Sequence, residues 1–316
     1  MTRRNTLAPV VRRLCPACHV EGRPWAAKRQ YRLDRCGVCG ALFVSHADLA
    51  PDVAETYAHY HSSASFVAPD VVETSLRRLV ESARPYRRKG FWLDLGFGEG
   101  ALLSAAESEG WACFGSEVSP HALDFGRTRG WTVSGNLTQD HRFQPGSFDV
   151  VTMIEVIEHL DDAGRLLHDA SRLLRPGGLF YLTTPNARSL NRWLLGAKWS
   201  IVCPPEHLTL WTAVGLRRLL VRSGLRDVRV RTEGFNPAEV MARVRFGNST
   251  SEVNRQSTGI ALSQALSRTR SRRAFKRLAN SILDLLGLGD TLKARAEKSD
   301  TDDPALRVPY RVPQDL

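Results

Sequence analysis

The chain has 316 residues, of which 42% are hydrophobic and 24% charged, and this composition is typical of a globular protein. The length suits two domains, or one large domain with a small one. No apolar run reaches the ~18 residues of a membrane-spanning helix. The basic N-terminus lacks the apolar core of a signal peptide, so we expect a cytoplasmic protein. The net charge of +11 favours an anionic partner, unless it only reflects an Arg-rich proteome.

Four of the six cysteines form a regular pattern near the N-terminus. Cys15 and Cys18 are followed after seventeen residues by Cys36 and Cys39, which gives C-x2-C-x17-C-x2-C. This spacing is typical of a four-cysteine zinc site, and four thiolates complete the tetrahedron that Zn²⁺ prefers. Because no coordination position stays open, we predict a structural zinc ribbon over residues 1–45.

A helical connector is expected over residues 46–88, with helices at 51–63 and 68–84. Apolar segments of strand and helix type then alternate, which predicts a mainly parallel sheet covered by helices on both faces. The predicted strands are 90–97, 111–119, a segment beginning at 148, 179–186, 225–234 and 290–298. The predicted helices are 100–110, 120–130, 161–178 and 213–224.

A basic helical segment interrupts this alternation at about 236–287, before the last predicted strand. Its densest part contains Arg268, Arg270, Arg272, Arg273, Lys276 and Arg277. Apolar residues lie between these charges, so the segment could be a solvated helix face, could lie on an anionic membrane surface or could bind RNA phosphates. We expect the tail at 299–316 to be flexible.

The most informative motif is the glycine-rich turn after the first predicted strand of the alternating region. Asp94 precedes Gly96, Gly98 and Gly100 in the sequence LDLGFGEG. The G-x-G-x-G spacing differs from the G-x-G-x-x-G of dinucleotide sites, and an aspartate in the strand would repel a pyrophosphate. Glu117 ends the next strand, where an acidic side chain accepts hydrogen bonds from a ribose. These features predict a nucleoside ligand without phosphates and with a positive charge, which is S-adenosylmethionine.

Residues 91–231 resemble the class I S-adenosylmethionine-dependent methyltransferases. The resemblance is carried by the ordered motifs LDLGFGEG, GSEVSP, FDVVTMIEVIEHLDD, LLRPGGLFYLTTPN and PPEHLTLWTAVGLRRLLVRSGL. The chain is most similar to the ubiquinone-biosynthesis and sugar methyltransferase branch, which often carries an N-terminal zinc knuckle. The resemblance implies an α/β fold: a Rossmann-like seven-stranded sheet with helices on both faces over residues 89–298, plus the small zinc ribbon.

The resemblance also assigns cofactor-binding roles by position. It places Asp94, Gly96, Gly98 and Gly100 at the methionine end of S-adenosylmethionine, Glu117 at the ribose, Val118, Asn136 and Leu137 around the adenine, and Ile154 and Glu155 near the methionyl moiety. Phe97 stands where the family usually has cysteine. We expect this larger side chain to narrow the cofactor pocket without abolishing binding.

Methyl transfer to a hydroxyl, or to a carbon next to a carbonyl, needs a group that removes a proton, most often a histidine. His207 follows Glu206 in the segment expected over the site, and a matching Glu-His pair is linked to catalysis in similar sugar methyltransferases. His207 could instead fix this loop by a hydrogen bond. His159 lies four residues after Glu155, so both could share a helical face, although packing is the favoured role for His159. Glu158 is expected to lie behind the site residues or to be exposed.

Three tryptophans, Trp193, Trp199 and Trp211, lie in the region that roofs the acceptor site in this fold. They could form aromatic walls for a sugar ring, a phenol or a nucleobase, or they could be core residues, the favoured role for Trp211. The leading hypothesis is a methyltransferase acting on a small molecule or a glycan, for example a sugar of a cell-surface polysaccharide or a lipid-linked precursor. Such an acceptor would allow contact with the inner face of the membrane. The alternatives are an RNA methyltransferase and a zinc-ribbon interaction protein with a relic cofactor fold. The oligomeric state stays open.

Overall fold

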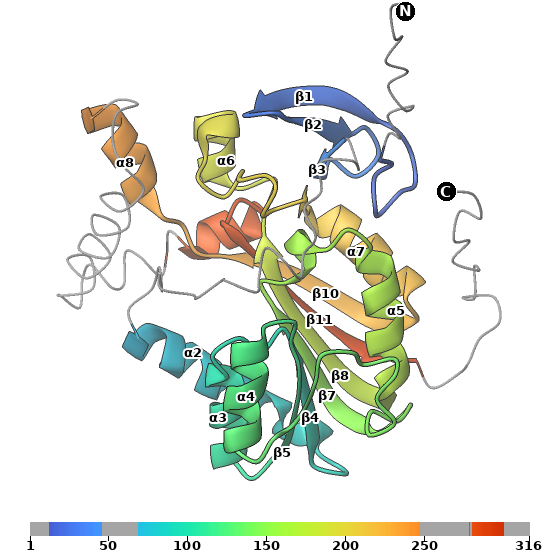
Figure 1. Ribbon diagram of the computed structural model, residues 1–316. Coiled ribbons are helices and arrows are strands. Elements are labelled where there is room, and N and C mark those ends of the chain that lie inside the picture. The colour runs from blue at the N-terminus through green and yellow to red at the C-terminus, as the bar shows by residue number, and fades with distance from the viewer. Residues whose placement is uncertain (1–12, 46–68, 247–277, 279, 300–316) are drawn as a thin grey trace, which may run out of the picture.

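The computed structural model describes residues 13–45, 69–246, 278 and 280–299 (Figure 1). The predictions for a helix at 51–63, for most of the basic segment and for the tail from residue 300 therefore lie outside the described residues. Within the described part, no helix combines the length and apolar composition needed to cross a membrane.

A seven-stranded sheet forms the centre of the molecule. In spatial order its strands are β10 (Leu225–Glu233), β11 (Thr291–Lys298), β8 (Leu174–Pro185), β7 (Phe148–Ile154), β4 (Phe91–Leu95), β5 (Ala112–Ser116) and β6 (Thr132–Ser134). The pairs from β8 to β6 are parallel, whereas β11 is antiparallel to both of its neighbours. This confirms the predicted Rossmann-like methyltransferase sheet.

Helices cover both faces of the sheet, because alternate strand residues point to opposite faces. One face packs against α2 (Pro69–Ala83), η2 (Arg84–Tyr86), α3 (Ala101–Ser108) and α4 (Pro120–Thr128), and the other against α5 (Ala163–Leu173) and α7 (Ala213–Arg222). In β4, Trp92 belongs to the first core, whereas Leu93 and Leu95 belong to the second. The continuous apolar character of this strand therefore reflects burial on both sides.

The N-terminal ribbon forms a second sheet that also contains a strand of the large domain. Its order is β1 (Gly22–Lys28), β2 (Tyr31–Cys36), β3 (Leu42–Val44) and β9 (Thr209–Leu210). The β3–β9 pair is antiparallel, and the Val44 N–H donates to the Leu208 carbonyl at 2.9 Å. The ribbon is thus tied by backbone hydrogen bonds to the loop that follows β8.

The segment between β8 and β9 contains α6 (Leu190–Leu195) and η4 (Gly196–Lys198), and it lies beside the ribbon (Figure 1). The helix predicted at 161–178 ends earlier, at Leu173, and β8 begins directly at Leu174. Helical residues also occur in α8 (Pro237–Phe246) and at 280–285, on either side of the part of the basic segment that is not described.

Candidate functional site

The turn between β4 and α3 lies against the end of β5. The Gly96 N–H donates to the Ser116 carbonyl at 2.7 Å. The Glu117 carboxylate accepts hydrogen bonds from the Gly98 N–H at 2.9 Å and from the Val118 N–H at 2.7 Å. The predicted acidic residue is therefore next to the predicted glycine turn, at the carboxyl edge of the sheet where ligands bind in such folds.

The three glycines of this turn all have positive φ, which side-chain-bearing residues rarely adopt. A Cβ at Gly96 would lie 2.5 Å from Val156, and one at Gly100 would lie 2.5 Å from the Trp131 ring. A Cβ at Gly98 would meet nothing within 4 Å. Close packing thus requires the outer two glycines, whereas Gly98 leaves open space beside Glu117 in which a ligand can approach the backbone.

Asp94 is buried, with 3% of its surface exposed. The Thr152 hydroxyl donates to its carboxylate at 2.7 Å and accepts from Trp92 Nε1 at 3.0 Å. Burial raises the pKa of Asp94 to about 7, and the negative charge of Glu117 adds to this effect. A cationic ligand would therefore stabilise the ionised carboxylate. Thr152 was not among the predicted site residues, because only the register of β4 and β7 places it opposite Asp94.

The larger side chain of Phe97 was expected to narrow the cofactor pocket, but its ring does not lie on the ligand side of the turn. Its ring is buried between β5 and α4, against Gly115 and Gly126 and near Trp131. A Cβ at Gly115 would lie only 2.4 Å from this ring. The large side chain is accommodated because two glycines leave room for it in the core.

The residues assigned to the adenine lie after β5 and β6. Val118 is a large apolar side chain with 45% of its surface exposed, as suits a residue that covers a flat ring. Leu137 is buried in the main core, and the Asn136 amide oxygen accepts from the backbone and hydroxyl of Thr138. Ile154, the last residue of β7, is half-buried.

Glu155 and His159 do not share a helical face. Glu155 has φ of 52°, and only residues 157–159 form a 3-10 turn, η3 (Ile157–His159). The Glu155 N–H still donates to the Thr183 carbonyl of β8, so the β7–β8 pairing ends at Glu155, where the positive φ turns the chain. Glu158 is not exposed: 1% of its surface is accessible, and one carboxylate oxygen accepts from the Thr184 hydroxyl at 2.8 Å.

The structure brings His159 and His207 together. Their ring centroids are 4.7 Å apart, with the planes at 67°. Nδ1 of His159 lies 2.7 Å from the Glu206 carbonyl, and Nδ1 of His207 lies 2.7 Å from the Ile201 carbonyl. Since a carbonyl only accepts, Nδ1 of His207 carries the proton and its Nε2 is the basic nitrogen. The Glu206 side chain is exposed, so its contribution is the backbone carbonyl.

Burial lowers the pKa of both histidines. For His207 the value falls to about 4, with the neighbouring His159 as the second cause. Both rings are therefore neutral near pH 7. Together with Glu158, whose Oε1 is buried without a hydrogen bond, they offer three ligand atoms within 4.8 Å of one another. This group could hold a proton or a divalent cation.

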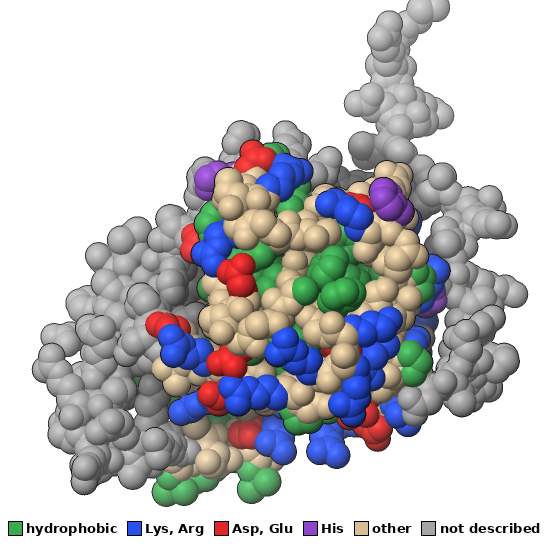
Figure 2. All heavy atoms as spheres, turned by 90° about the horizontal axis from the view of Figure 1, so that it is seen from below, with side chains coloured by type: hydrophobic (Ala, Val, Ile, Leu, Met, Phe, Trp, Pro, Cys, Tyr) green, Lys and Arg blue, Asp and Glu red, His purple; other side chains and the backbone are tan. Residues whose placement is uncertain are grey.

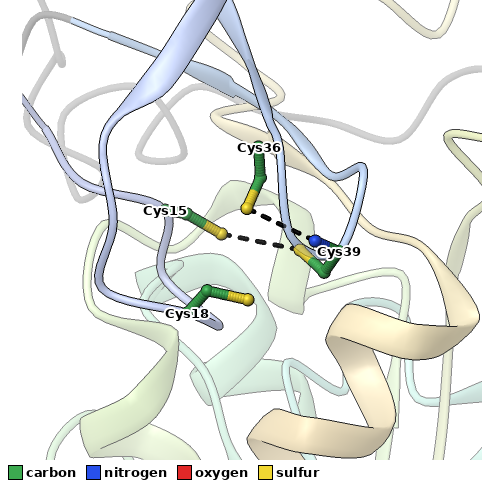
Figure 3. A group of neighbouring side chains, drawn as sticks. All are labelled: Cys15, Cys18, Cys36 and Cys39. Atoms are coloured by element: carbon green, nitrogen blue, oxygen red, sulfur yellow. Dashed lines mark hydrogen bonds between the residues drawn. The ribbon is translucent and has the colours of Figure 1, made fainter.

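The four N-terminal cysteines converge on one point (Figure 3). Their sulfur atoms lie within 4.8 Å of one another, and those of Cys15 and Cys39 are 3.7 Å apart. Zn–S bonds of about 2.3 Å place neighbouring sulfurs of a tetrahedron about 3.8 Å apart. The arrangement therefore fits a four-cysteine zinc ion.

The cysteine cluster is packed against α7 of the large domain. The Thr212 hydroxyl donates to the Cys39 carbonyl at 2.7 Å, and Arg218 donates to Cys18 Sγ at 3.4 Å. A Cβ at Gly215 would lie 3.2 Å from Cys39 Sγ. Three of the four cysteines belong to the same apolar core as the helices under the sheet, so the cluster is part of the domain packing.

The three tryptophans near the expected acceptor region have different environments. Trp211 is fully buried in the main core, as favoured from the sequence, and Trp199 is buried in a small core under the ribbon. Trp193, on α6, has 69% of its surface exposed. Of the three, only Trp193 offers an accessible aromatic face.

Comparisons with known proteins agree with this architecture. A family model described as a methyltransferase domain matches residues 70–230, a little over half of the chain. A ubiquinone biosynthesis O-methyltransferase from Idiomarina loihiensis is 30% identical over 165 residues, which cover 46% of this chain and 65% of that protein. A relative with the same name from Thiobacillus denitrificans is 28% identical over 180 residues, covering 53% of this chain and 77% of that protein.

The match thus spans less than two thirds of the length of the Idiomarina relative. Among solved structures, a SAM-dependent methyltransferase from Archaeoglobus fulgidus is 20% identical, with a TM-score of 0.49, and the alignment covers 73% of this chain and 95% of that one.

Proposed function

Because the chain belongs to the methyltransferase-domain family, within the class I S-adenosylmethionine-dependent enzymes, we propose that it transfers a methyl group to a small molecule or a glycan. The observation that carries this proposal is the acidic, glycine-lined edge of the sheet. There Glu117 accepts hydrogen bonds from the Gly98 turn, and the space beside Gly98 is open. The buried carboxyl group of Asp94 lies on β4, one residue before that strand ends.

These residues fit the cofactor in shape and charge. Bound S-adenosylmethionine would supply an electrophilic methyl group on a sulfonium. The open turn at Gly98 would receive the methionine end, and the Glu117 carboxylate can accept further hydrogen bonds from ribose hydroxyls because each oxygen has two lone pairs. Val118 would cover the adenine. Burial disfavours the ionised form of Asp94 when no cation is bound. The sulfonium charge of the ligand would favour that ionised form, and the carboxylate would in turn attract the sulfonium.

His207 is the proposed proton acceptor. Its ring is fixed by the Ile201 carbonyl in the tautomer that leaves Nε2 basic. Because its pKa is lowered to about 4, the ring is neutral at physiological pH. A base this weak does not deprotonate a hydroxyl in advance, so His207 would take the proton only as the new bond to the methyl carbon forms. Burial would oppose the positive charge on His207, and burial also raises the pKa of the neighbouring Glu158 well above its usual value, so this carboxyl supplies no ready counter-charge.

The cysteine cluster is proposed to hold a structural zinc ion. Cys15, Cys18, Cys36 and Cys39 occupy all four positions of a tetrahedral site, which leaves none for a substrate. The ion would fix the ribbon, and the ribbon would hold the loop of His207 through the β3–β9 pair. The zinc ion would thus fix the position of the His207 loop and would take no part in the methyl transfer itself.

The acceptor is proposed to be a small molecule or glycan, and RNA is the competing acceptor. RNA binding needs a continuous basic surface. On the face opposite the ribbon, Lys and Arg side chains are interspersed with Asp and Glu instead of forming one patch (Figure 2). The names of the relatives from Idiomarina and Thiobacillus also favour a small-molecule hydroxyl as acceptor.

Methyl-labelled S-adenosylmethionine, purified protein and host lysate test this proposal. We expect label in a small-molecule, glycan or solvent-extractable fraction that resists ribonuclease, and we expect Asp94→Ala to abolish its incorporation. The exposed Arg32→Gln variant serves as the matched control. Label released by ribonuclease would overturn the small-molecule assignment and favour the RNA enzyme.

A further inference from the structure

Two arginines on the ribbon sheet lie directly opposite each other. Arg23 of β1 and Arg35 of β2 are paired in the antiparallel register. Opposite residues in such a pair have Cβ atoms about 4.5–5.5 Å apart on the same face, and like charges there are destabilising. Both side chains are exposed. The same face carries Leu33, two residues before Arg35, and Leu42, which pairs with Arg35.

The apolar part of this face is covered by the segment that follows β8. Leu33 and Leu42 pack in one small core with Ala187 and Trp199. The two arginines of β1 and β2 lie on the same face as this core. The ribbon and the segment around α6 are therefore two walls of one junction, with α6 beside the ribbon (Figure 1).

The second wall adds two more guanidinium groups, Arg188 and Arg192. Arg188 is exposed, and Arg192 is half-buried with its Nε bonded to the Ala187 carbonyl. Burial lowers the pKa of Arg192, and the positive charges of Arg35 and Arg188 lower it further. Arg192 is thus close enough to both arginines to be repelled by them.

No carboxylate lies within ion-pair distance of these four guanidinium groups in the part of the chain that the structure describes. None of the four arginines forms an ion pair there. By contrast, Arg175 is paired with the buried Asp149, and Arg13 with Asp161. Guanidinium groups bind phosphate oxygens by two parallel hydrogen bonds, so a phosphate would turn this repulsion into attraction.

Of the four arginines, Arg188 lies at the same edge of the sheet as the candidate site, because it closely follows the carboxyl end of β8. Arg188 follows the end of β8 by three residues, and the Thr183 carbonyl of β8 accepts from the Glu155 N–H. The Ala187 N–H donates to the Trp211 carbonyl at 2.7 Å, just after β9. The guanidinium of Arg35 extends to Gly40, whose Cβ would lie 3.8 Å from it and 3.7 Å from Thr212.

We propose that Arg23, Arg35, Arg188 and Arg192 form a subsite for the phosphate or pyrophosphate group of a phosphorylated acceptor. This inference rests on the proposed function, because it places the acceptor between the ribbon and α6. It names the class of substrate: a small molecule activated or tagged by phosphate. Neither the ribbon nor the large domain supplies the subsite alone.

Calorimetric titration of the full-length protein with pyrophosphate tests the subsite without any methyl transfer. We expect saturable binding that Arg35→Gln and Arg188→Gln each weaken about 10- to 100-fold, the effect of one charge-assisted contact. Arg35→Lys should lose part of this affinity because lysine lacks the planar fork. Arg32→Gln, on the same strand but the opposite face, is the matched control and should bind like the wild type.

Thermal unfolding and a parallel titration with S-adenosylhomocysteine separate the possible failures. Variants that unfold at the wild-type temperature and bind S-adenosylhomocysteine normally, yet lose pyrophosphate, support the subsite. Pyrophosphate binding that is absent, or unchanged in Arg35→Gln and Arg188→Gln, overturns it while leaving the methyltransferase proposal intact. If the wild-type protein does not bind S-adenosylhomocysteine, the proposed methyltransferase function itself is wrong. Binding of an RNA oligonucleotide, but not pyrophosphate, through the same arginines would also overturn the proposal.

Discussion

Replacing Asp94 by asparagine should make the protein more stable and, at the same time, unable to hold its cofactor tightly. Asp94 is buried, and its pKa is raised from 3.8 to about 7, mainly by burial. Because the pKa of Asp94 is higher in the folded than in the unfolded protein, the protonated carboxyl favours folding. This contribution to the unfolding free energy is complete below pH 3.8 and is lost as the pH rises through 7. At pH 8 the cofactor-free protein therefore carries a buried charge that opposes folding.

Two magnitudes follow from this environment. The shift of about 3 pKa units corresponds to at most ~4 kcal/mol of unfolding free energy at pH 8, and asparagine would remove this penalty while still accepting the hydrogen bond from Thr152. For the cofactor, a carboxylate about 5 Å from a positive charge at an effective dielectric constant near 20 contributes about 3 kcal/mol. Its loss would weaken S-adenosylmethionine binding ~100-fold.

The assay combines thermal unfolding at pH 8 with equilibrium binding of S-adenosylmethionine between pH 6 and 9. For the wild type, affinity should rise with pH through about 7 and then level off, because binding favours the ionised carboxylate. For Asp94→Asn the melting temperature should rise, and the affinity should be low and independent of pH over this range. An Asp94→Asn protein that is less stable, or that keeps wild-type affinity, would refute the reasoning.

Three further predictions concern the base, the metal and the buried ion pair of Asp149 at the start of β7. His207→Ala should lower kcat by about 10²–10⁴-fold with unchanged S-adenosylhomocysteine affinity; equal activity would leave His207 only a loop-fixing role. Purified protein should contain about one zinc per chain by atomic absorption, and Cys36→Ser should lose the zinc and melt at a lower temperature. Asp149→Ala should reduce the unfolding free energy by about 3–5 kcal/mol in urea titrations, because it leaves the Arg175 guanidinium and the N–H groups of residues 88–90 without their acceptor. An undiminished midpoint would contradict the last prediction.

The strands and the cofactor edge could be predicted because their information is local. Asp94 and the glycines follow a continuous apolar strand, and Glu117 ends the next one, so chain order alone places them at one edge of the sheet. The final strand at 291–298 was also predictable in position. Its antiparallel pairing with both neighbours was not predicted, because alternation of elements by itself predicts parallel strands.

The ribbon's connection to the large domain could not be predicted from local pattern. β9 has only two residues, and its partner β3 is far away in sequence. A two-residue strand has no periodicity to detect. The same limit applies to Arg23, Arg35 and Arg188, which look like ordinary exposed charges until the register and the fold bring them together.

Two local predictions failed for steric reasons. Glu155 and His159 have helical spacing, yet the positive φ at Glu155 ends the regular backbone at the sheet edge. Phe97 sits within the glycine turn, but its ring points into the core because Gly115 and Gly126 leave space there. In both cases the deciding neighbour comes from another element of the chain.

The most direct test of the account is equilibrium dialysis of labelled S-adenosylmethionine against the purified wild-type protein at pH 8, with Glu117→Ala in parallel. The account predicts saturable binding of one molecule per chain, which S-adenosylhomocysteine competes for and which Glu117→Ala strongly weakens because the ribose hydroxyls lose their acceptor. Absence of saturable binding to a folded, zinc-loaded wild type would contradict the central claim that the edge formed by Asp94, Gly98 and Glu117 is a methyl-donor site.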